Sequence, residues 1–194
     1  MRQMFVTILS FPVIRLCILG VFVAGVVVAC NNPFATRTPE EPPAGGAVLK
    51  PPNSAENVLY NLDVSFDSLS IQDFLGTMSE DFVFVPDPDD SLEYETDFRG
   101  MWDKIVETDF ANNFFITVDS AIRLTSQYEY KPGGDYYEYL YTLEIKDEGK
   151  TIPVIGRSWL YLREYDGSWY IYLWVDHKIQ KSGNTWGVIR ALYN

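Results

Sequence analysis

The feature that most constrains the fold of this sequence is the dipeptide Asp166-Gly167, which separates two runs of alternating aromatic and apolar residues. Asp-Gly in this setting indicates a β-hairpin with a type I′ turn, because both central residues of that turn need φ > 0. Counting outward from the turn predicts four cross-strand pairs: Tyr165 with Ser168, Leu162 with Ile171, Trp159 with Trp174, and Arg157 with Asp176.

The predicted hairpin has two different faces, because side chains alternate across a strand. One face is apolar and carries Leu160, Leu162, Trp169, Ile171, Leu173 and Val175. The other is aromatic and charged and carries Arg157, Trp159, Tyr161, Tyr170, Tyr172, Trp174 and Asp176. An aromatic face of this size must be covered by helices, covered by a partner, or left partly open as a pocket.

A third strand is predicted before this hairpin, joined to it through residues 146–150. A three-residue loop would place Tyr139 opposite Arg157 and Lys146 opposite Lys150. It would add Tyr137, Tyr139, Tyr141 and Leu143 to the aromatic face. A four-residue loop would shift the pairing by one position and move this set to the other face. The sequence leaves both registers open.

The first thirty residues have the layout of a secretory signal. Arg2 and Arg15 precede an uncharged apolar stretch, which ends at the boundary Val27-Val28-Ala29-Cys30. That boundary resembles the lipobox of bacterial lipoproteins. The resemblance implies a signal peptide over residues 1–29 and a diacylglycerol on Cys30 that anchors the protein to a membrane. The alternative is a transmembrane anchor, because apolar residues run nearly from Met4 to Ala29.

The predicted organisation is a signal peptide (1–29), a lipidated Cys30 with a Pro- and Gly-rich tether (30–53), and one domain (54–194). The expected location is extracytoplasmic, on the outer membrane if the cell has one, because Asn31 is not the aspartate that retains lipoproteins in the inner membrane of enteric bacteria. The net charge of −12 argues against binding to nucleic acid or to anionic lipid head groups.

The rest of the domain is predicted from spacing and capping residues. Asn53 with Glu56, and Ser70 with Asp73, have the spacing of capping boxes at the starts of two amphipathic helices. A short strand over 81–85 ends at Pro86, and a third helix carries the apolar stripe Phe98, Met101, Trp102 and Ile105. Alternation from Ile116 to Thr125 predicts a strand. Residues 185–193 fit either a strand or a short helix.

The acidic segment Asp87-Pro88-Asp89-Asp90 has two interpretations. Clustered carboxylates can bind calcium, but the loop lacks the Gly at its sixth position and the Glu at its twelfth, where Phe98 stands. A solvated acidic loop is therefore expected, with no metal site and no cofactor.

The order helix, helix, strand, helix and antiparallel meander resembles the nuclear-transport-factor-2-like superfamily over roughly residues 53–194. The matching features are the paired helices, Phe82-Val83-Phe84 before the acidic segment, and Gly167-Ser168-Trp169-Tyr170-Ile171 entering the last long strand. The resemblance implies an α+β fold in which N-terminal helices pack on a strongly curved antiparallel sheet, cone-like and cystatin-like. Members include SnoaL-like polyketide cyclases, ketosteroid isomerases and noncatalytic binding domains.

The residues that could carry chemistry are few. His177 is the only histidine, which disfavours a histidine metal cluster and a Ser-His-Asp triad. A carboxylate base remains possible in principle: Asp176 among aromatic rings, with Tyr139 or Tyr172 as hydroxyl donor. The predicted pairing with Arg157 instead favours a structural ion pair.

The sequence therefore favours a noncatalytic module that binds a small apolar ligand or an envelope protein, with a homodimer through the outer sheet face as a further candidate. The alternative is a cofactor-free isomerase or cyclase. The candidate residues of a ligand pocket are Trp102, Arg157, Trp159, Trp174 and Asp176.

Overall fold

The computed structural model describes residues 48–180 and 183–194, which belong to the unit that begins at Gly45. The predicted signal peptide and Cys30 lie outside the described residues, so they stay predictions. Within the described ranges, no helix is both long and apolar enough to cross a membrane.

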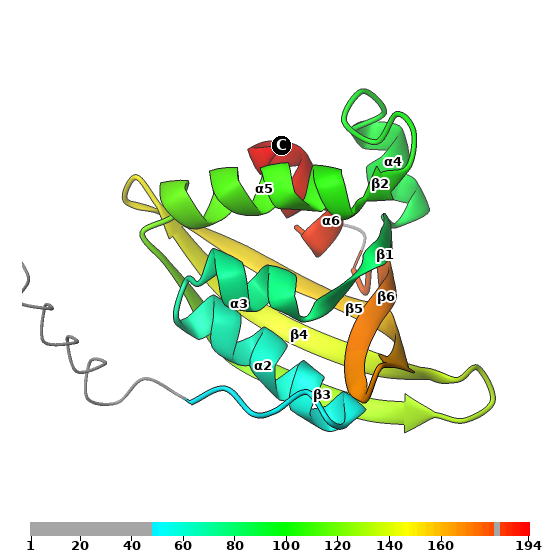
Figure 1. Cartoon of the computed structure of the whole chain (residues 1–194). Coiled ribbons are helices and arrows are strands. Elements are labelled where there is room, and N and C mark those ends of the chain that lie inside the picture. The colour runs from blue at the N-terminus through cyan, green and yellow to red at the C-terminus, as the bar shows by residue number, and fades with distance from the viewer. Residues whose placement is uncertain (1–47, 181–182) are drawn as a thin grey trace, which may run out of the picture. The chain divides into compact units, whose positions relative to one another are not determined.

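The described chain forms a single sheet with helices before, between and after its strands (Figure 1). The elements are α2 (Ala55–Asp67), α3 (Ile71–Gly76), β1 (Met78–Val85), α4 (Pro88–Glu93), β2 (Trp102–Asp103), α5 (Lys104–Thr117), β3 (Ser120–Lys131), β4 (Tyr136–Asp147), β5 (Lys150–Tyr165), β6 (Ser168–His177) and α6 (Trp186–Tyr193). This confirms the predicted α+β class.

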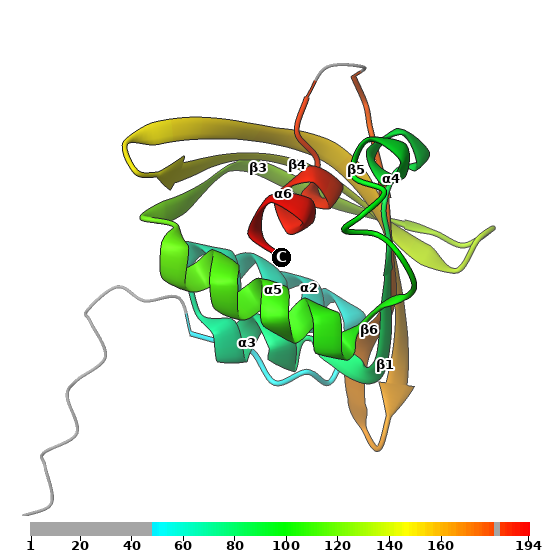
Figure 2. The same cartoon turned by 90° about the horizontal axis from the view of Figure 1, so that it is seen from above.

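The strands lie in the order β2-β1-β6-β5-β4-β3. Every neighbouring pair is antiparallel except β1 and β6, which run parallel. The sheet is therefore mixed at this one pair, where the sequence predicted antiparallel pairing throughout. Figure 2 shows the strands curving around the helices α2, α5 and α6, which lie on the concave side. We call the opposite side the outer face.

The Asp166-Gly167 turn is as predicted, with φ of 48° and 80°. The pairs Tyr165 with Ser168 and Leu162 with Ile171 are confirmed. Farther from the turn the register shifts between Tyr161 and Leu162, which leaves Tyr172 as the extra residue of a β-bulge.

The bulge overturns the other two predicted pairs. Trp174 lies opposite Leu160, and Asp176 lies opposite Ser158, while Trp159 and Arg157 face Val175 and His177. A slip of one residue moves a side chain to the other face of the sheet. Trp174 and Asp176 therefore lie on the concave side, whereas Trp159 and Arg157 lie on the outer face.

The turn between β4 and β5 is shorter than either predicted loop. Glu148 and Gly149 have φ of 47° and 77°, and Asp147 pairs with Lys150. Tyr139 therefore lies opposite Ser158 and not opposite Arg157. The tyrosines at 139 and 141 are buried on the concave side, and they do not extend the aromatic outer face.

The helix starts follow local side-chain caps. Ser54, one residue later than predicted, caps α2 by accepting from the Asn57 N–H, while Ser70 caps α3 as predicted. The third predicted helix begins only at Lys104, behind the cap Asp103, so Phe98, Met101 and Trp102 precede it. The acidic segment forms the short helix α4, capped by Asp87.

The end of α5 differs from the sequence prediction, and the structure of residues 186–193 decides between the two predicted alternatives. Ile116 lies in the last turn of α5, and the following strand begins at Ser120. Residues 186–193 form the helix α6, with Thr185 as its cap, which decides between the two predicted alternatives.

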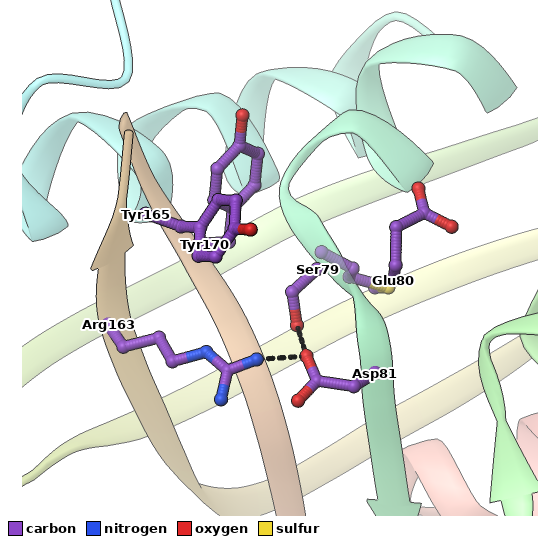
Figure 3. Close-up of a pocket in the computed structure, with 7 residues that line it drawn as sticks. Ser79, Glu80, Asp81, Arg163, Tyr165 and Tyr170 are labelled. Carbon is purple, nitrogen blue, oxygen red and sulfur yellow. Dashed lines mark hydrogen bonds and ion pairs between the residues drawn. The ribbon is translucent and has the colours of Figure 1, made fainter. Parts of the chain in front are cut away.

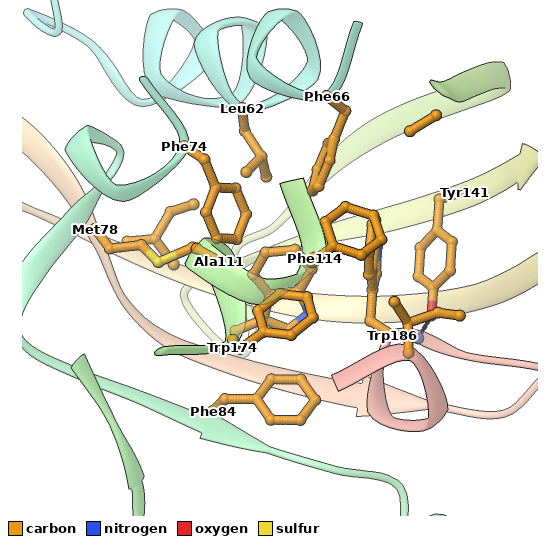
Figure 4. Close-up of a cluster of buried hydrophobic side chains, with 14 of the residues drawn as sticks. Leu62, Phe66, Phe74, Met78, Phe84, Ala111, Phe114, Tyr141, Trp174 and Trp186 are labelled. Carbon is orange, nitrogen blue, oxygen red and sulfur yellow. Dashed lines mark hydrogen bonds between the residues drawn. The ribbon is translucent and has the colours of Figure 1, made fainter. Parts of the chain in front are cut away.

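The core is a continuous cluster of aromatic rings between the sheet and the helices (Figure 4). Trp186 of α6 is 1% exposed and lies at its centre. Its ring stacks on Phe66 of α2 at 4.6 Å between centroids, and it meets Phe114 of α5 and Trp174 of β6 edge-on. Trp186 therefore occupies the concave side of the sheet, between β6 and the helices.

Candidate functional site

The structure does not bring the five predicted pocket residues together. Trp102, Trp174 and Asp176 are buried on the concave side. Arg157 and Trp159 lie on the outer face, where Trp159 contacts the ring of His177 at 4.2 Å between centroids. The two groups are thus separated by the sheet itself.

Asp176 is fully buried and held by donors from three elements. Its Oδ1 accepts hydrogen bonds from the hydroxyls of Tyr141 and Ser158, each at 2.8 Å. Its Oδ2 accepts from the backbone N–H of Gly187 at 2.9 Å. Because Gly187 lies in the first turn of α6, the carboxylate sits at the positive end of that helix.

The tyrosine beside Asp176 is Tyr141, which is neither of the two predicted donors. The Tyr139 hydroxyl donates to Asp63 at 3.2 Å, and Tyr172 lies on the outer face against Tyr161. Tyr141 crosses β5 at Gly156, where an added Cβ would come within 2.0 Å of the tyrosine hydroxyl. The local cue in the sequence was this glycine inside a strand, which indicates a close approach by a neighbour.

Burial raises the pKa of Asp176 to about 6. The hydrogen bonds from Gly187, Tyr141 and Ser158 act in the opposite direction, because they stabilise the ionised carboxylate. The charge of Arg190 also lowers this pKa. The predicted partner Arg157 has no part in this environment. Burial likewise raises the pKa of Tyr141 well above its usual value.

A buried ion pair links α6 to α5. Arg190 donates to both carboxylate oxygens of Glu107, from Nη2 at 2.6 Å and from Nε at 2.9 Å. The indole of Trp102 donates to the same carboxylate at 2.6 Å. The guanidinium lies 3.9 Å from the Phe84 ring centroid and 4.5 Å from that of Trp174. Both charged side chains are 0% exposed.

A third buried contact joins α4 to the start of α6. Asp90 is fully buried, accepts a hydrogen bond from Thr185, and pairs with Lys178. The expectation of a solvated acidic loop is therefore wrong for Asp90. Among residues 48–180 and 183–194, no group of three His, Cys, Asp or Glu side chains is arranged to hold a metal ion.

Through these three contacts, the carboxylates of Asp176, Glu107 and Asp90 hold α6 against the concave side of the sheet. Three surface hollows lined by described residues, of 390, 310 and 280 Å³, include neither Asp176 nor Trp174. The candidate base Asp176 is itself 0% exposed.

The outer face carries a row of half-buried aromatic rings, which we call the outer aromatic row and define as Tyr136, Trp159, Tyr161 and Tyr172. Neighbouring centroids lie 5.0 to 6.2 Å apart along the row. Arg163 lies over the Tyr172 ring at 5.0 Å. The row therefore crosses β4, β5 and β6.

A surface hollow of 390 Å³ continues the row beside the β5–β6 turn (Figure 3). It is lined by Met78, Ser79, Glu80, Asp81, Arg163, Tyr165 and Tyr170. The hollow lies where the pairing of β1 with β6 is interrupted, between Met78 and Val83. Arg163 spans it to pair with Asp81, to which Ser79 also donates.

A comparison with protein families and with curated proteins finds no match. Solved structures with a similar arrangement include a ketosteroid isomerase-like protein from Erwinia carotovora atroseptica, with 17% identity, a TM-score of 0.46, and coverage of 64% of this chain and 93% of that one. An NTF2-like protein from Cytophaga hutchinsonii has 10% identity, a TM-score of 0.43, and coverage of 64% and 94%. These likenesses concern the fold and say nothing about activity.

Proposed function

We propose that this chain is a noncatalytic binding module that docks a partner protein on the outer aromatic row. The observation that carries the proposal is the contrast between the two sides of the sheet. On the concave side Trp186 is packed between β6 and the helices, and the candidate base Asp176 is 0% exposed. The outer side leaves Trp159 and three tyrosines only partly buried, in a contiguous row.

The composition of the outer face fits a protein interface. Tyrosine, tryptophan and arginine are the side chains most enriched at interface centres, because they bury large areas and also form hydrogen bonds. Here Arg157 and Arg163 flank the aromatic row. A heterologous partner is favoured over a second copy, because two chains of net charge −12 repel each other. The hollow beside Tyr165 would accept a protruding side chain of that partner.

A photo-crosslinking residue in place of Tyr161 is expected to give one defined adduct in the producing cells. A crosslinker in place of Ile105, which is 73% exposed on α5, is the matched control and is expected to give none. The captured protein, once purified, should bind the unmodified chain. Its dissociation constant should rise about tenfold or more with Tyr161→Ala and stay unchanged with Ile105→Ala. An adduct of the chain with itself, or equal affinities for both variants, would overturn the proposal.

The proposed location is the outside of the cytoplasmic membrane, anchored through a lipid on Cys30. It is supported by the sequence Val27-Val28-Ala29-Cys30. Mass spectrometry of the protein from its native membrane is expected to show an N-terminus at Cys30 that carries diacylglycerol. Replacing Cys30 with Ser should abolish the lipid and release the domain from the membrane. A mature protein that retains Met1 would contradict this prediction.

The cyclase or isomerase alternative is supported by one observation. The pKa of Asp176 is raised, and its carboxylate accepts a hydrogen bond from the Tyr141 hydroxyl. A general base must come within hydrogen-bond distance of the proton that it removes. Asp176 is 0% exposed, and each of its oxygens already accepts a hydrogen bond. Catalysis would require α6 to leave the concave side, so we place this alternative second.

A further inference from the structure

Three side-chain nitrogens on the outer face are buried without a hydrogen-bond partner among the described residues. They are Nε of Arg157, Nε1 of Trp159 and Nε2 of His177. Buried nitrogens of this kind are normally paired, because losing water without gaining an acceptor is costly. Their presence in one place therefore needs an explanation.

The three side chains are neighbours on β5 and β6. Arg157 is the cross-strand partner of His177, and the rings of Trp159 and His177 are 4.2 Å apart. The charge of Arg157 also helps to lower the pKa of His177, although burial is the larger cause. The cluster lies beside the outer aromatic row, where Tyr136 stacks on Trp159 at 5.0 Å.

The donors define the chemistry of a ligand that would satisfy them. The arginine and indole nitrogens can only donate, and the imidazole nitrogen can donate in one tautomer. A carboxylate has two acceptor oxygens in the plane that suits a guanidinium. Glu138 lies 3.7 Å from Nη1 of Arg157, and both Glu138 and Asp87 act on His177 electrostatically. These anions disfavour a doubly charged phosphate more than a singly charged carboxylate.

We propose that Arg157, Trp159 and His177 form a binding site for a monocarboxylate with an apolar body. The carboxylate lies against Arg157 and the indole nitrogen of Trp159, and the apolar body covers the rings of Tyr136 and Trp159. The ligand enters past Arg157, whose side chain is 41% exposed. The carboxylate belongs either to a small aromatic acid or to an acidic side chain of a docked protein.

Sodium benzoate is the first probe, and the indole N–H signal of Trp159 in the ¹⁵N-labelled full chain is the readout. Trp159→Phe assigns that signal among the five tryptophans. Benzoate is expected to shift it saturably, with a dissociation constant in the millimolar range. Arg157→Gln should weaken binding about tenfold or more, because the charged partner is lost. Arg99→Gln, which changes an exposed arginine in the segment before β2, should leave binding unchanged.

Benzamide and acetyl-glutamate amide complete the test. Benzamide has the same ring without the charge and should not bind. Tighter binding of benzoate than of acetyl-glutamate amide assigns the site to free aromatic acids, and the reverse assigns it to acidic side chains. No saturable shift with either acid, equal binding by Arg157→Gln, or equal binding of benzamide would overturn the proposal. The site shares Tyr136 and Trp159 with the proposed docking surface, but the benzoate titration uses no partner protein, so the two proposals can fail separately.

Discussion

Replacing Glu107 with Ala is expected to lower the free energy of unfolding by about 3–5 kcal/mol, the usual cost of breaking a buried ion pair. The substitution leaves the Arg190 guanidinium fully buried, with the carboxylate that accepted two of its hydrogen bonds removed. It also removes the acceptor of the Trp102 indole. Urea denaturation of the wild type and the variant at one pH measures the difference.

A double variant shows whether charge or packing causes the loss. Glu107→Leu combined with Arg190→Leu removes both charges and is expected to recover most of the lost stability, because a buried ion pair replaced by apolar residues is often neutral. Asp81→Ala is the exposed control, since it breaks the surface pair with Arg163 and should cost less than about 1 kcal/mol. If Glu107→Ala costs no more than Asp81→Ala, the buried pair does not anchor α6.

Asp176→Asn is expected to change how stability depends on pH. The folded pKa of about 6 exceeds the ordinary value of 3.8, so between these values the folded protein retains a proton that the unfolded chain releases. The wild type therefore loses stability as pH rises through this window, by about 3 kcal/mol in total. Asparagine has no such titration. Because the unfolded carboxyl is already about half ionised at pH 4, the stability lost on substitution should be about 2 kcal/mol larger at pH 4 than at pH 7.

The measurement is urea denaturation of both proteins at pH 4 and pH 7, and the quantity compared is the difference between wild type and variant. The other carboxylates change the free energy of unfolding of both proteins equally, so their contribution cancels in this difference. An equal difference at the two pH values would show that Asp176 is not enclosed as the structure has it. Conversely, turnover of a ketosteroid-like or polyketide-like substrate by the wild type, lost in the equally stable Asn variant, would support the enzyme alternative.

The sequence predicted the fold class and the hairpin turn because both depend on local signals. Asp166-Gly167 fixes its own dihedral angles, and the pairs next to it follow from the turn. The bulge at Tyr172 left no such signal. Residues 169–175 are aromatic or apolar at every position, so a slip of one residue does not disturb the alternation that normally defines a register.

The error in the candidate site follows directly from that bulge. The predicted partner of Asp176 was Arg157, and both were assigned to one face with Trp159 and Trp174. The actual partners are Tyr141, Ser158 and Gly187. The face of Tyr141 was left open, because it depends on the length of another turn. Gly187 belongs to a nine-residue segment whose periodicity did not distinguish a strand from a helix. Contacts between residues so far apart in the sequence can be predicted only when the strand register across every intervening turn is known.

The position of α6 also determines the order in which the domain can complete its packing. All the partners that hold α6 precede it along the chain, with Glu107 separated from Arg190 by 83 positions and Tyr141 from Trp186 by 45. During synthesis, the sheet and the other helices therefore emerge before the tryptophan that fills their concave side. Until then Trp174, Phe66 and the Asp176 carboxyl lack their closing neighbour, so the concave side closes only after α6 has been made. A chain cut before Thr185 would lack Trp186 and would leave the apolar concave side of the sheet open.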